Sequence, residues 1–113
     1  MNVDDCVFCN IANHSISGDI VTENDELIVL KDILPKAPVH LLVLPKDHIP
    51  SVNDIKPGHE ALMGRMILLA QQMAKQHGVA DSGYKLIFNV GKEGGQMVKH
   101  MHLHLLGGKQ LAE

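Results

Sequence analysis

The most constraining feature of this sequence is an alternation of histidine and apolar residues near the C-terminus. The segment His100-Met101-His102-Leu103-His104-Leu105-Leu106 has a period of two, and successive side chains of a β-strand point to opposite faces. We therefore predict a strand over His100–Leu106, with the three histidines on one face and the aliphatic residues on the other. The aliphatic face is expected to pack on a helix, and the imidazole face is expected to line a polar site.

Three interpretations of this histidine face are open. A solvated edge strand that is merely rich in histidine is disfavoured, because three imidazoles on one strand face are an unusual composition. A metal site is a serious alternative, since two histidines at positions i and i+2 of a strand can share an ion. The third interpretation is catalysis, in which one neutral imidazole attacks phosphorus and its neighbours donate hydrogen bonds to the developing charge.

A glycine-rich stretch before the histidines fits the catalytic interpretation. Backbone N–H groups in such a loop can approach a phosphate closely, and Gly94-Gly95-Gln96 offers such a loop. Asn89 and Gln96 carry neutral amide donors that suit the same ligand. Gly-Gly-Gln alone is a weak signal.

The other apolar patterns predict the rest of the fold. Short apolar runs bounded by turn residues indicate strands, and a long run with helical spacing indicates a helix that starts at Pro57, with Asn53 or Asp54 near its cap, and stops before Gly78. The expected strands are Asp19–Thr22, Leu27–Lys31, His40–Leu44 and Tyr84–Asn89, and the expected helices are Val7–His14 and Pro57–His77. Because strands and helices do not alternate, we predict an α+β fold with a five-stranded antiparallel sheet, one long helix and one short helix.

Length and charge exclude several classes of protein. The chain has 113 residues, which suits a single domain over 1–113. A formal net charge of −3 without a run of Lys and Arg argues against nucleic acid as a partner, but leaves a single nucleotide open. No apolar stretch is long enough to cross a bilayer, and the acidic N-terminus lacks the basic start of a secretory signal. We therefore expect a cytoplasmic protein without a membrane partner.

Cys6 and Cys9 stand in a C-x-x-C arrangement. In a reducing compartment this spacing suggests metal or redox chemistry rather than a structural disulfide. The motif is weak by itself, because a metal site needs two further ligands. Two buried, reduced cysteines on the short helix are the simpler alternative.

The residues around the histidines resemble the signature of the histidine triad family. One block is Gly94-Gly95-Gln96 followed by Val98–Gly108, and a second block comprises Asp32–Pro35, Ala37–Lys46 and His48-Ile49. The resemblance continues through Cys6–Ile11 and Tyr84–Asn89, so it covers nearly the whole chain. The closing Gly107-Gly108 is most similar to the nucleotide-binding, phosphoramidase-like branch.

This resemblance implies a hydrolase of purine nucleoside 5′-phosphoramidates or related nucleotide conjugates, acting through a nucleotidyl-histidine intermediate. His102 matches the nucleophile, His104 and Gln96 match phosphate-contacting residues, and His40 matches the histidine that supports the triad. Asp32 matches the residue that holds the ribose hydroxyls. Further nucleotide contacts are implied for Phe8, Ile11, Ile16, Leu30, Ile33, Asn89 and Met97. A dinucleoside polyphosphate hydrolase and a non-catalytic nucleotide-sensing or partner-binding module remain as alternatives.

The resemblance also implies a metal centre and an assembly. In zinc-bearing members the ligand positions correspond to Cys6, Cys9, His48 and His100. Such a zinc is structural and is not required for the reaction, because many relatives lack the cysteines. The family forms symmetric homodimers, so we expect one here. Three departures affect the substrate: Met97 stands where many relatives have Ser, Ser17 replaces a common Pro, and the sequence ends at Glu113 without the longer tail of some relatives.

Overall fold

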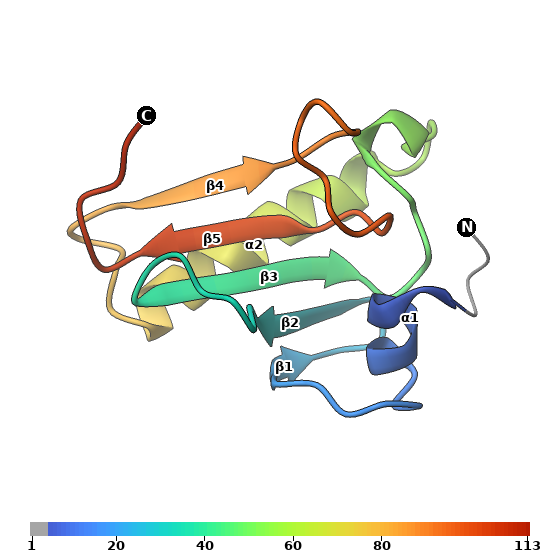
Figure 1. The fold of residues 1–113 in the computed structure, drawn as a ribbon, viewed down its shortest axis with the longest axis horizontal. Coiled ribbons are helices and arrows are strands. Elements are labelled where there is room, and N and C mark those ends of the chain that lie inside the picture. Colours follow the sequence, from blue (N-terminus) through green and yellow to red (C-terminus); the bar gives the residue numbers. More distant parts are fainter. Residues whose placement is uncertain (1–4) are drawn as a thin grey trace.

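The alternating apolar runs form five strands of one antiparallel sheet in the computed structural model, which describes residues 5–113. The strands are β1 (Ile20–Glu23), β2 (Leu27–Lys31), β3 (Val39–Pro45), β4 (Tyr84–Phe88) and β5 (Leu103–Gly107). They lie in the order β1-β2-β3-β5-β4, with α1 (Val7–Ala12), η2 (Val52–Asp54) and α2 (Glu60–Gln76) around them (Figure 1). The predicted α+β class, with a five-stranded antiparallel sheet and one long and one short helix, is confirmed.

Both faces of the central strands are covered, so their side chains are apolar in nearly every position. Leu41 and Val43 of β3 pack with Met66 and Ala70 of α2, which crosses one face of the sheet (Figure 1). Leu42 and Leu44 face the other way and pack with α1 residues, among them Phe8. Because Leu42 is paired with His104, the histidine of β5 lies on the α1 face. The packing of the aliphatic residues Met101, Leu103 and Leu105 against the long helix agrees with the prediction.

The long helix begins at Glu60 rather than at Pro57, and the reason lies in the preceding turn. Gly58 has a φ of 101°, which a right-handed helix excludes. The N–H of His59 donates to the carbonyl of Lys56, so Pro57 and Gly58 occupy the centre of a turn, as in a type II turn. Asn53 and Asp54 belong to η2, so neither caps the helix. The short helix ends at Ala12, because His14 has a φ of 65°.

The C-terminal strand begins at Leu103, so the predicted start at His100 is wrong. The register pairs Leu103 with Val43, which would bring Met101 opposite Pro45 if the ladder continued. Pro45 has no N–H to donate, and the N–H of Met101 instead donates to the carbonyl of Ile49. His100 therefore lies in a bend and His102 in the irregular segment just before β5, and only His104 belongs to the strand.

Within residues 5–113, none of the helices has the length and apolar character needed to span a membrane.

Candidate functional site

The three histidines of the signature serve two separate groups of residues. His100 is fully buried and turns toward the two cysteines of α1. His102 and His104 lie next to each other on the α1 face of the sheet, with 4.9 Å between their ring centroids. His40 on β3 and Asp32 beyond the end of β2 complete the second group, which has the composition of a catalytic centre.

The position of the proton on His102 follows from its hydrogen bond. Its Nδ1 atom lies 2.7 Å from the backbone carbonyl oxygen of His100, and a carbonyl can only accept. Nδ1 therefore carries the proton, and in the neutral ring Nε2 carries a free lone pair. Burial lowers the pKa of His102 below its usual range, so the ring is neutral at pH 7. A neutral imidazole with a fixed tautomer is the form that a nucleophile requires.

A chain of hydrogen bonds fixes the tautomer of His104 in the same way. The N–H of Lys36 donates to Nδ1 of His40, which places the His40 proton on Nε2. That atom lies 2.9 Å from Nδ1 of His104 and 3.4 Å from a carboxylate oxygen of Asp32. With Nδ1 accepting, neutral His104 carries its own proton on Nε2. Burial first, and then the neighbouring His102 and His40, lower the pKa of His104 to about 4.

Amide side chains hold the glycine-rich loop in place, so these amides are not free to bind a ligand. Gln96 accepts the N–H of Gly91 through Oε1 and donates from Nε2 to the carbonyls of Pro50 and Val98. Asn89 donates from Nδ2 to the carbonyl of Gly94. The predicted phosphate contact of Gln96 is therefore not preformed, because its amide is occupied in holding the loop. A contact with phosphate requires Gln96 to give up one of these bonds.

The residues implied in base binding fall into two groups. Phe8, Ile11 and Leu30 are buried in one apolar cluster on the α1 face. By contrast, Ile16, Ile33 and Met97 have exposed fractions of 44%, 87% and 90%. The expected wall is thus only partly formed. Ile33 is turned outward by a bend in which Asp32 accepts the N–H of Leu34, and this local turn was not evident from the sequence.

Besides the His100 carbonyl that binds His102, two further contacts in the site come from backbone atoms. The N–H of Lys36 orients His40, and the carbonyl of Pro45 accepts from Nε2 of His100 at 2.7 Å. Neither contact could be predicted from the sequence, because every residue type carries a carbonyl and almost every one carries an N–H.

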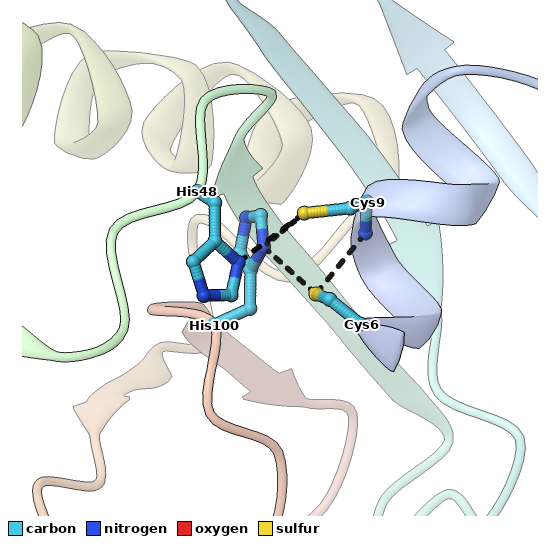
Figure 2. Close-up of side chains that lie close together, drawn as sticks. All are labelled: Cys6, Cys9, His48 and His100. Carbon is cyan, nitrogen blue, oxygen red and sulfur yellow. Dashed lines mark hydrogen bonds between the residues drawn. The ribbon is translucent and has the colours of Figure 1, made fainter. Parts of the chain in front are cut away.

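The two cysteines and two histidines form a compact cluster (Figure 2). The Nδ1 atom of His100 lies 3.3 Å from Sγ of Cys6 and 3.4 Å from Sγ of Cys9. The Nδ1 atom of His48 lies 3.2 Å from Sγ of Cys9. Because Nε2 of His100 donates to the Pro45 carbonyl, the lone pair of Nδ1 points at the sulfurs. These are the four positions that the family resemblance implies as a ligand set, and their ligand atoms lie close together in the structure.

The donor set of this cluster suits a tetrahedral metal ion. Bonds of about 2.0 to 2.3 Å in a tetrahedron separate the ligand atoms by about 3.3 to 3.8 Å, close to the distances observed here. Cys6 and His100 are fully buried, so solvent reaches little of the cluster. Burial and the adjacent Cys6 thiol raise the pKa of Cys9 to about 12. The residues present are therefore a possible Cys2His2 metal site.

A second group with metal-ligating atoms consists of Asp32, His40 and His104. These residues already contact one another in the group of His102, His104, His40 and Asp32 described above. A hollow of about 270 Å³ borders Asp32 and His40. A larger hollow of about 680 Å³ lies between β4 and the C-terminal residues and contains none of the site histidines.

Comparison with known proteins yields consistent similarities along nearly the whole chain. Residues 5–112 match the family described as scavenger mRNA decapping enzyme C-term binding. A purine nucleoside phosphoramidase of Escherichia coli K12 is 44% identical over 96% of this chain and 91% of its own length. A HIT family hydrolase from Legionella pneumophila Philadelphia 1 superposes with a TM-score of 0.94 at 42% identity, covering 96% of both chains. A Zn-bound histidine triad family protein from Mycobacterium smegmatis superposes with a TM-score of 0.80 at 27% identity, covering 96% of this chain and 78% of the other.

Proposed function

The chain belongs to the histidine triad family of hydrolases, and we propose that it cleaves purine nucleoside 5′-phosphoramidates and related nucleotide conjugates through a covalent nucleotidyl-histidine intermediate. The observation that carries the proposal is the neutral His102 ring, whose Nδ1 proton is held on the His100 carbonyl and whose Nε2 lone pair is free. The proposed substrate class is that of the relative named purine nucleoside phosphoramidase, at 44% identity.

His102 acts as the nucleophile in this proposal. Its Nε2 atom forms a bond to the α-phosphorus, and the P–N bond breaks as the leaving amine gains a proton from solvent. The positive charge that develops on the imidazole is stabilised by the Nδ1–H bond to the His100 carbonyl. Water then attacks phosphorus and loses a proton to solvent, the histidine–phosphorus bond breaks, and the nucleoside monophosphate leaves with His102 restored.

The surrounding residues bind and orient the substrate. His104 donates its Nε2 proton to the phosphoryl oxygens, and His40 keeps His104 in the tautomer that can do so. The Asp32 carboxylate accepts from the ribose hydroxyls, and Gln96 contacts phosphate after releasing a loop bond. Phe8, Ile11 and Leu30 provide the buried part of the base wall, and three exposed residues provide the rest of it. These exposed residues are Ile16, Ile33 and Met97, with Asn89 as a further polar contact.

We further propose that the cluster of Cys6, Cys9, His48 and His100 binds a structural zinc ion. The support is the fit of the donor atoms and the similarity to the Zn-bound relative. All four positions are filled by protein atoms, so the ion would tie α1 to the sheet and leave no open position for substrate.

A homodimer and a cytoplasmic location complete the proposal, with residues 1–113 as one domain. The dimer is supported by β4, which is an edge strand of the sheet, and by the exposed Leu86, Ile67 and Leu68. Reduced thiols at Cys6 and Cys9 are what a metal requires, and a reducing compartment maintains them. The location therefore follows from the proposed zinc site.

A substrate screen distinguishes the proposed activity from the two alternatives. Wild type and His102→Ala are compared on adenosine 5′-phosphoramidate and on a diadenosine polyphosphate, and nucleotide binding is measured by calorimetry. We expect His102-dependent turnover that favours the phosphoramidate. Preference for the polyphosphate would indicate the sister reaction, and binding without turnover would indicate a sensor.

A further inference from the structure

We infer that Phe8 is a positioning residue for the nucleophile, because its ring holds the His102 imidazole in the orientation that the reaction needs. The ring centroids of Phe8 and His102 are 5.1 Å apart, with 78° between the planes. This edge-to-face geometry is a favourable arrangement for aromatic rings. The inference rests on the proposed function of His102 and gives Phe8 a role beyond that of a base wall.

The His102 ring needs support from packing as well as from its hydrogen bond. A rotation of 180° about the Cβ–Cγ bond of His102 would place ring carbon atoms where Nδ1 and Nε2 now lie. The bond to the His100 carbonyl holds only one edge of the ring. Phe8 and His104 are the two aromatic neighbours of His102, and the His104 ring lies at 4.9 Å and 62°. Because His104 has its own task toward the substrate, Phe8 is the neighbour free to act as a fixed support.

The position of Phe8 is itself fixed from two directions. Its side chain is 8% exposed and packs in the apolar cluster on the α1 face, with Ile11 and Leu42 among its members. The flanking residues Cys6 and Cys9 reach His100 and His48 at 3.3 and 3.2 Å. A helix of six residues is too short to be stable alone, so these contacts determine where α1 and its phenylalanine lie.

Phe8 therefore joins the Cys/His cluster to the catalytic group. Its ring also lies edge-on to His100, with 5.9 Å between centroids and 84° between planes. One side chain thus contacts both the histidine that faces the sulfurs and the histidine that faces the substrate. A displacement of α1 would move the Phe8 ring and thereby change the orientation of His102.

The chain contains only one other phenylalanine, Phe88, which provides a matched control. Phe88 lies on β4 and packs against the cluster on the α2 face. The test compares Phe8→Leu, Phe8→Tyr and Phe88→Leu, with Phe8→Met as the replacement should Phe8→Leu fail to fold. Each variant is assayed on adenosine and uridine 5′-phosphoramidates, so that a loss of base contact can be separated from a loss of orientation.

For Phe8→Leu we expect kcat to fall by about tenfold or more, by a similar factor on both substrates, with KM changed by less than about threefold. Phe8→Tyr keeps the ring and should retain kcat within about threefold, as should Phe88→Leu. If Phe8 served only as an apolar wall for the base, Phe8→Leu would instead raise KM, mainly for the purine substrate. That result would overturn the inference.

A spectroscopic measurement keeps this inference separate from the proposed activity. The Nδ1 proton of His102, held on a buried carbonyl, should give a slowly exchanging NMR signal in wild type and in Phe88→Leu. The signal should be lost or broadened in Phe8→Leu. An unchanged signal in Phe8→Leu would reject the positioning role, whereas an inactive wild type with the expected signals would reject only the proposed function.

Discussion

His100 and His102 are linked by a 2.7 Å hydrogen bond from the Nδ1–H of His102 to the backbone carbonyl of His100. The side chain of His100 meanwhile faces Cys6 and Cys9. One residue thus uses its side chain for the cysteine cluster and its carbonyl to set the tautomer of its neighbour. The two histidines have different partners although they are only two positions apart, because His100 lies in a bend before β5 and its side chain turns toward the cysteines.

Replacing the nucleophile is the first prediction that follows from this geometry. His102→Ala removes the atom that forms the covalent intermediate, so turnover of a phosphoramidate should fall by several orders of magnitude. A nucleoside monophosphate should still bind. Steady-state kinetics and calorimetry measure the two effects. His14→Ala serves as control, because His14 is exposed and pairs with Glu23. The mechanism is wrong if His102→Ala keeps more than about a tenth of wild-type turnover.

The fold could be predicted well from the sequence because periodicity reports burial directly. Apolar residues with helical spacing identified α2, and β2 has the bounds that its apolar run predicted, Leu27–Lys31. Element ends were predicted less accurately, since they depend on single backbone groups. The positive φ of Gly58 and the missing N–H of Pro45 decided where α2 and β5 begin. Both effects arise at single residues, so the periodicity of the sequence does not reveal them.

The site could be predicted only as far as residue types and spacing allow. The C-x-x-C motif and the resemblance brought together the four residues of the cysteine cluster. The resemblance did not reveal that the Gln96 amide donates to two backbone carbonyls, or that Ile33 points outward. Those facts depend on which backbone carbonyls lie nearby after folding, and a sequence pattern carries no information about them.

Metal content gives the second prediction. Protein purified without chelators should contain about one zinc per chain, and chelation should lower its Tm, because binding energy at a structural site contributes to folding. Cys9→Ser should lose the metal, since Cys9 lies within 3.4 Å of both His48 and His100. His104→Asn is the control: it removes a histidine from the other metal-ligating group and should retain zinc. Gently purified protein without zinc would rule out the site.

Assembly gives the third prediction. Light scattering at micromolar concentration should report twice the mass of the chain, because a second copy would cover the β4 edge and its exposed apolar residues. Leu86→Lys places a charge on this edge strand and should shift the equilibrium toward the monomer. Ile33→Lys changes an exposed apolar residue away from β4 and should leave the mass unchanged. A monomer mass for wild type would reject the dimer.

The buried histidines make the folded protein less stable as the pH falls. The pKa of His104 is about 4 in the folded protein and has its ordinary value of 6.5 in the unfolded chain. Above the unfolded value both states are neutral, and stability is complete. As the pH falls from about 6.5 to about 4, the unfolded chain binds a proton that the folded protein does not, so stability is lost. Burial lowers the pKa of His40 as well, which adds to the effect in the same direction.

Urea unfolding at about pH 7.5 and about pH 5 measures this dependence. We expect a lower midpoint at the acidic pH, and a smaller difference between the two midpoints in His104→Asn, which cannot take up the proton. His59→Asn is the comparison, because His59 lies at the start of α2, outside the histidine group. Equal pH differences in wild type and His104→Asn would show that His104 is not the group responsible.

The last prediction concerns the leaving group and Met97. In a phosphoramidate the amine must gain a proton as the P–N bond breaks, so a donor near it assists the reaction. The family resemblance implies a Ser at this position in many members, whereas here the side chain is that of Met97, which is 90% exposed beside the glycine-rich loop. A thioether is at best a weak acceptor and cannot donate. One missing hydrogen bond in the transition state is worth about 1 kcal/mol, or roughly a factor of five to ten.

Met97→Ser should therefore raise kcat/KM for a phosphoramidate by up to about tenfold, and should raise it less for a nucleotide ester with a good oxygen leaving group, which needs less protonation. Met97→Ala is the matched control, because it removes the thioether without supplying a donor. Because Met97 is exposed, neither change creates a cavity in the core, so both variants should fold. Equal gains on both substrates, or the same gain in Met97→Ala, would show that the effect comes from access to the site rather than from a proton donor.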